Sequence, residues 1–151
     1  MTASIPDLLA NTAAEALGTM FFTSVTRRWQ GSVVADTSRA PLVRIPFLAG
    51  AGSSGYLDLR VSREGAQSIA SSFLATEEEV PEHRVNDVIC ELANVICGAL
   101  LSVLLSERGF RLLTPEVLRE PSGGVNPATF EEALELERGW LTLHLNLGSN
   151  P

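Results

Sequence analysis

One long helical segment limits what this chain can fold into. It runs from about His83 to about Ser106, in the longest apolar-rich part of the sequence, and is followed by Gly109, a residue suited to ending a helix. At about 100° per residue, most of its circumference from Val88 onward carries only apolar residues or cysteine. We therefore expect a helix that is buried over most of its surface.

One narrow stripe of this helix is polar. Asp87, Glu91, Asn94 and Gly98 fall within an arc of about 60°, and Ser102 borders them. Between Asp87 and Ser102 the stripe has no basic residue and only one long side chain, whereas a solvated helix face usually carries several. Gly98 costs about 1 kcal/mol relative to alanine inside a helix, so another backbone is expected to approach it closely. That backbone could belong to a docking partner. It could instead belong to this domain, and in that case Gly98 permits tight internal packing while Glu91 and Asn94 reach solvent beside it.

The stripe does not match the common catalytic groups. One carboxylate and one amide do not make a metal site, because no histidine or cysteine joins them. They also activate no serine or cysteine nucleophile. A carboxylate can instead pair with a cation on a partner, and an amide can both donate to and accept from one water. Elsewhere, His83 and His144 have no ligand-spaced neighbours, so we expect His83 to be a surface residue and His144 to be structural. The glycine-rich Gly50–Gly55 segment leads into a strand, so we expect a plain loop.

The rest of the chain predicts an α+β domain. The expected elements are a helix over Ile5–Val25, strands over Val25–Ala35, Leu42–Ala49 and Gly55–Ser62, a helix capped by Ser62, an extended segment Phe110–Pro121 interrupted by Pro115, a loop over 121–128, and a hairpin over Ala133–Leu147. A short helix is an alternative for Phe130–Glu137, and Pro46 suggests an edge strand. The alternating strands predict a mostly antiparallel sheet of about six strands with long helices packed on one face, and residues 1–151 form one domain.

Composition excludes several classes of protein. The net charge of −7, from 18 acidic and 11 basic residues, argues against nucleic-acid binding and against docking on anionic membranes. No stretch reaches the roughly 18 uninterrupted apolar residues of a membrane helix, and no secretory signal opens the chain, so we expect a cytoplasmic protein. On one helix, Cys90 and Cys97 would lie about 10 Å apart, too far for a disulfide, and we expect reduced core cysteines.

The string DVICELANVICG, from Asp87 to Gly98, resembles the signature helix of the CheC/CheX/FliY family of bacterial chemotaxis phosphatases. The mark of that family is E-x-x-N, with an acidic residue four positions before the Glu and a glycine four positions after the Asn. Asp87, Glu91, Asn94 and Gly98 match all four positions. The order of the surrounding segments is also CheX-like, so the resemblance covers most of the chain.

One departure narrows the resemblance. CheC-type members carry a second E-x-x-N on the first helix, but here Glu15 is followed by Ala16, Leu17 and Gly18, and the amide is missing. The chain is therefore similar to the single-site, CheX-like members.

The resemblance implies a phosphatase that acts on the phosphoaspartate of CheY-like receiver domains. Glu91 would pair with a lysine of the receiver, and Asn94 would hold the attacking water in line with the acyl phosphate. Asp87 and Gly98 would support the docking surface. The chain would need no cofactor of its own, because the receiver brings its Mg²⁺. The resemblance also implies a homodimer, for which the face of Thr142, His144 and Asn146 or the edge of the sheet would serve.

Two other functions stay open. In the first, the protein is a non-catalytic CheX-like adaptor that binds a receiver or a flagellar or signalling component, and the stripe only docks. In the second, it is an oligomerisation domain whose stripe is internal. A stripe covered inside one protomer would favour the second.

Overall fold

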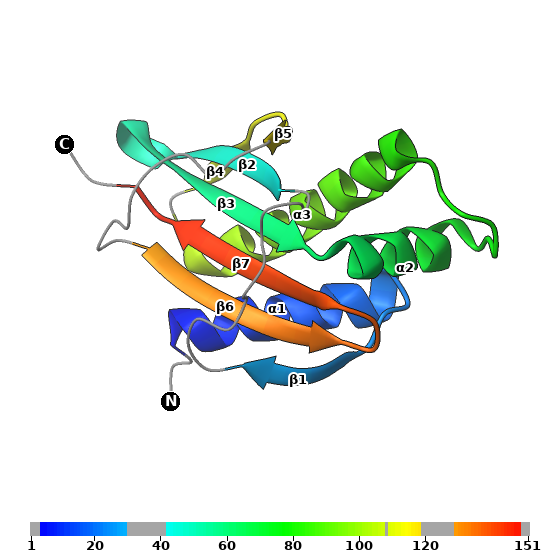
Figure 1. Cartoon of the computed structure of the whole chain (residues 1–151). Helices are drawn as coiled ribbons and strands as arrows, with labels where there is room; N and C mark the ends of the chain where they lie inside the picture. The colour runs from blue at the N-terminus through cyan, green and yellow to red at the C-terminus, as the bar shows by residue number, and fades with distance from the viewer. Residues whose placement is uncertain (1–3, 30–41, 108, 119–128, 149–151) are drawn as a thin grey trace.

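The computed structural model describes residues 4–29, 42–107, 109–118 and 129–148 (Figure 1). The helices are α1 (Ile5–Met20), α2 (Arg63–Leu74) and α3 (Glu82–Leu104), with a short 3-10 turn at Gly50–Gly52. The strands are β1 (Val25–Trp29), β2 (Leu42–Ala49), β3 (Ser53–Val61), β4 (Phe110–Leu112), β5 (Glu116–Leu118), β6 (Thr129–Leu136) and β7 (Trp140–Asn146). Segment 121–128 and the end of the expected Val25–Ala35 strand lie outside the described residues.

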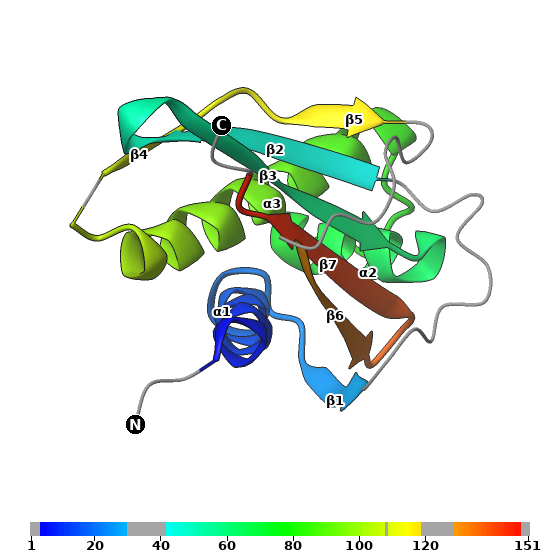
Figure 2. The same cartoon turned by 90° about the vertical axis from the view of Figure 1, so that its left-hand side faces the viewer.

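The strands form one antiparallel sheet in the order β1-β6-β7-β3-β2-β4, with β5 pairing with the same edge of β2 as β4 does. The helices lie on one face of this sheet, with α1 over the β1–β6 side and α3 over the β2–β4 side (Figure 2). This confirms the predicted α+β architecture. The sheet has seven strands where about six were predicted, because the extended segment after α3 makes two short strands on either side of residues 113–115.

Pro46 does not mark an edge strand. Its strand, β2, pairs with β3 on one side and with both β4 and β5 on the other. Pro46 lies opposite the break between β4 and β5, where Leu113 donates its backbone N–H to the Pro46 carbonyl over 2.9 Å. The sheet tolerates the missing proline N–H here because no strand residue of β4 or β5 stands opposite it.

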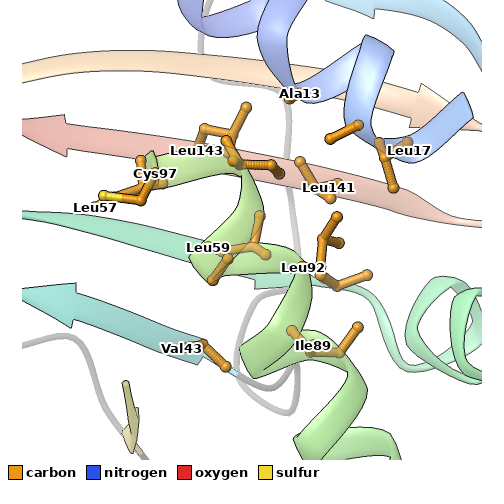
Figure 3. Close-up of a cluster of buried hydrophobic side chains, with 14 of the residues drawn as sticks. Ala13, Leu17, Val43, Leu57, Leu59, Ile89, Leu92, Cys97, Leu141 and Leu143 are labelled. Atoms are coloured by element: carbon orange, nitrogen blue, oxygen red, sulfur yellow. The ribbon is translucent and has the colours of Figure 1, made fainter. Parts of the chain in front are cut away.

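The core fills the space between the sheet and the helices. Leu92 and Ile96 of α3 are fully buried, and Figure 3 shows α3 side chains lying among those of α1 and of strands β2, β3 and β7. Among the described helices, α3 is the one long and apolar enough to cross a membrane by length and composition. Its apolar side packs on α1, α2 and the sheet, so the core of this domain accounts for that apolarity.

Local contacts fix where α3 begins. Ser62 caps α2 by accepting a hydrogen bond from the Gly65 N–H, and it also accepts one from the Trp140 N–H, which ties α2 to the β6–β7 hairpin. The Gln67 side chain then holds both backbone groups of Val80, since its amide donates to the carbonyl and its oxygen accepts from the N–H. The loop that leads into α3 is therefore held on α2.

The first helix ends five residues earlier than predicted. Phe22 takes a left-handed conformation, with φ of 53°, and the Thr23 N–H donates to the Leu17 carbonyl over 2.9 Å. Glycine is the residue preferred at a left-handed position after a helix, and phenylalanine stands here instead, so no stop signal was visible near Met20. The hairpin prediction is confirmed, and Phe130–Glu137 lies in strand β6 and its turn, not in a helix.

Candidate functional site

The polar stripe lies on the side of α3 that faces away from the core. Asp87 and Glu91 are exposed, and Asn94 and Gly98 are partly exposed. On the opposite side of the same turns, Leu92 is fully buried. The stripe is therefore not internal to the protomer, and Glu91 and Asn94 lie one helical turn apart on the exposed side.

The two polar side chains at the centre of the stripe have no partners within the described part of the domain. In the described part of the chain, neither Glu91 nor Asn94 makes a side-chain hydrogen bond or an ion pair. By comparison, two charged groups on the open face of the sheet are paired with each other: Arg44 donates two hydrogen bonds to Asp58, at 2.7 and 2.9 Å. These bonds raise the pKa of Arg44 above its usual value. The stripe thus keeps its hydrogen-bonding capacity for a partner or for water.

Gly98 has room for a side chain within its own protomer. A Cβ at this position would meet only the Leu112 Cδ1 atom of β4, at 3.7 Å, which is an ordinary van der Waals contact. By comparison, a Cβ on Gly55 would lie 2.3 Å from the Asn146 carbonyl oxygen, so that glycine is needed by the fold. Tight packing within the described domain does not account for Gly98.

The replacement Gly98→Ala is expected to stabilise the protein by about 0.5–1 kcal/mol, because alanine loses less backbone entropy in a helix. Thermal or denaturant unfolding would measure the change, with Gly55→Ala as the control that should destabilise. A destabilised Gly98→Ala variant would contradict the absence of packing constraints around this residue.

Other chemically active groups do not add to the stripe. Both cysteines are free, and burial raises the pKa of the Cys97 thiol to about 12, so it stays protonated near neutral pH. Burial also raises the pKa of Cys90, which is half-buried beside the stripe. His83 is exposed and His144 partly exposed, and among the described residues no cluster of three or more His, Cys, Asp or Glu side chains is placed to hold a metal ion.

The corresponding positions on α1 are exposed but lack the amide. Glu15 and Gly18 both reach the surface, and a Cβ on Gly18 would meet nothing within 4 Å. This helix therefore offers a carboxylate without a neighbouring carboxamide.

Sequence reasoning missed two residues beside the stripe. Leu112 of β4 lies next to Gly98, and Val117 of β5 stands on the helix side of the sheet, opposite Val43. No local pattern points to them, since their place beside α3 depends on both short strands pairing with β2, which precedes them by more than 60 residues.

An open antiparallel sheet covered on one face by helices, with an uncommitted carboxylate and carboxamide on the exposed side of the longest helix, defines a domain of the CheC/CheX type. The family model described as Chemotaxis phosphatase CheX matches residues 42–136, more than half of the 151-residue chain. The chain belongs to the CheX family.

Solved structures share the fold at low sequence identity. The chemotaxis protein CheX from Vibrio vulnificus matches with a TM-score of 0.76 and 15% identity, over 95% of this chain and 96% of that one. CheX from Desulfovibrio desulfuricans gives 0.75 and 15%, over 95% and 98%. A CheX–CheY–BeF3–Mg²⁺ complex from Borrelia burgdorferi gives 0.70 and 12%, over 98% and 100%. A search of curated proteins found no significant sequence match.

Proposed function

We propose that this protein is a phosphatase of phosphorylated, CheY-like receiver domains. The observation that carries the proposal is the pair Glu91 and Asn94, side chains without partners in the described domain, on the exposed side of α3 in a member of the CheX family. The CheX protein of the Borrelia burgdorferi complex is bound to CheY, which supports a receiver as the partner.

In the proposed mechanism this chain supplies one half of an active site. Glu91 pairs with a lysine of the receiver and fixes the docked orientation. Asn94 holds a water in line with the phosphorus by accepting a hydrogen bond from it while the water oxygen attacks, and the hydrogens of that water leave with the phosphate. The P–O bond to the receiver aspartate breaks, and the electron pair leaves with the carboxylate as inorganic phosphate is released. Asp87 and Gly98 belong to the docking surface around this pair.

A site to which this chain contributes a positioned water and the receiver contributes the phosphoryl group suits phosphoryl transfer, because positioning and charge stabilisation account for most of its catalysis. The charge on the phosphoryl oxygens is offset by Mg²⁺ held by the receiver, as the Mg²⁺ in the Borrelia burgdorferi complex suggests. A protein that only positions a water needs no nucleophile and no metal of its own.

The test is phosphate release from phosphorylated receiver domains of the same genome, with and without this protein. We expect acceleration above the receiver's own dephosphorylation for at least one receiver. Binding to a receiver without acceleration would overturn catalysis and support the adaptor function instead.

We further propose that residues 1–151 form a single cytoplasmic domain that assembles as a homodimer. Light scattering is expected to give about 32 kDa, twice the 16.2 kDa of one chain. On the hairpin face, Thr142 and His144 are partly exposed, whereas Asn146 is buried and accepts a hydrogen bond from the Gly148 N–H. A mass of one chain at micromolar concentration would contradict the dimer.

A further inference from the structure

One exposed apolar side chain stands beside the stripe. The large exposed hydrophobic residues of the described chain are Met20, Phe22, Leu48, Phe73, Val103, Leu113 and Val117. Three of them lie at the C-terminal ends of α1 and α2, and Val103 lies in the last turn of α3. Leu48 and Leu113 follow core-facing residues directly, so they point to the face without helices. Val117 alone is on the helix side of the sheet next to α3.

The register of β5 fixes where the Val117 side chain points. Val117 is paired with Val43, a fully buried residue whose side chain faces α3, and directly opposite residues of a ladder share one face. Strand β5 contacts α3 and lies on the outer edge of β2 (Figure 2). Val117 is nevertheless 47% exposed, so α3 does not cover it.

This position makes Val117 continuous with the stripe. Along the same edge of β2, Leu112 of β4 packs against the core beside Gly98. Between this edge and the stripe, the half-buried Cys90 adds further apolar surface. On the α3 side, the exposed carboxylate of Glu91 borders this surface. The result is an apolar strip next to polar and charged groups, which is typical of protein interaction surfaces.

Stable binding of a partner at the stripe requires apolar surface next to it. Glu91 and Asn94 exchange bonds with water for bonds with the receiver, and such exchanges contribute little net affinity. Buried apolar anchors, with polar groups around them, usually supply most of the affinity of an interface. We propose that Val117 is the apolar anchor for the receiver domain, which covers it with an apolar patch next to its phosphorylated site. This inference rests on the proposed receiver partner, and it makes Val117 a residue that determines binding without touching the reacting atoms.

The experiment measures binding of this protein to a receiver domain loaded with BeF3 and Mg²⁺, so that it does not depend on turnover. Val117→Asp is expected to weaken binding about tenfold or more, and the isosteric Val117→Thr by a smaller factor. In the phosphatase assay, the same variants should raise KM while kcat stays near the wild-type value. Val103→Asp and Val103→Thr are matched controls on another exposed valine, in the last turn of α3.

Thermal unfolding of each variant shows whether weaker binding reflects loss of docking or loss of the fold. If Val117→Asp does not fold, the milder Val117→Thr still tests the proposal. Unchanged binding by both Val117 variants would overturn the anchor while leaving the proposed phosphatase intact. Loss of turnover in Asn94→Ala with Val117-dependent binding supports both proposals. If Asn94→Ala still dephosphorylates the receiver while binding depends on Val117, the proposed role of Asn94 is contradicted and the proposed role of Val117 is supported. Failure of the wild-type protein to bind any receiver would overturn the anchor as well.

Discussion

The replacement Asn94→Ala is expected to slow phosphate release from a phosphorylated receiver by about 100-fold or more, relative to the wild-type protein. The reason is that the carboxamide is the group proposed to hold the attacking water, and alanine neither donates nor accepts a hydrogen bond. Binding of the BeF3-loaded receiver should change by less than about threefold, because a water-mediated contact adds little net affinity. A single-turnover phosphate assay and a binding titration measure the two quantities separately.

Asn11→Ala is a matched control for this variant. Asn11 is an exposed asparagine on α1, and both changes replace asparagine by the better helix former alanine. Neither variant should lose stability, so reduced turnover in Asn94→Ala would not reflect unfolding. Wild-type turnover in Asn94→Ala would remove the proposed role of this residue.

Charge reversal at Glu91 is the second large effect. Glu91→Lys is expected to lower kcat/KM by about 100-fold or more, since two like charges facing each other at an interface cost several kcal/mol. Glu91→Gln, which keeps the shape and removes the charge, should lie between this variant and the wild type. Measuring kcat/KM at low and high salt adds a second criterion, because screening should partly restore Glu91→Lys.

The control for charge reversal is Glu15→Lys. Glu15 is an exposed glutamate on α1, so the change in net charge is the same but the position lies off the stripe. Equal losses in the two variants would show that overall charge, rather than a pairing at Glu91, sets the rate. A fully active Glu91→Lys variant would exclude the proposed ion pair.

The exposed stripe was predictable because it depends on one local quantity, the angle between successive residues of a helix. Once α3 was recognised, the positions of Asp87, Glu91, Asn94 and Gly98 followed within one arc, and the structure places all four on its exposed side. The absence of partners for Glu91 and Asn94 was not predictable, because it depends on which distant segments pack nearby. The same holds for the space around Gly98, which β4 borders from another part of the chain.

In the fold, too, local features were predictable and long-range pairings were not. Strand β2 and the β6–β7 hairpin were visible as alternation and turn residues, and β2 has the predicted ends. The strand order was not visible, because β1 pairs with β6 and β3 pairs with β7 across long stretches of sequence. The end of α1 was missed since Phe22 occupies a backbone conformation that its residue type disfavours.

The two hydrogen bonds between Gln67 and Val80 have a consequence for recognition. One side chain restrains the segment that delivers the chain into α3, and the helix that follows is anchored along its whole inner side. The groups proposed to meet a partner are thus displayed on a preformed scaffold instead of a loop. Little conformational freedom would be lost on complex formation, so the speed of association would be limited by diffusional encounter and orientation rather than by rearrangement of this subunit.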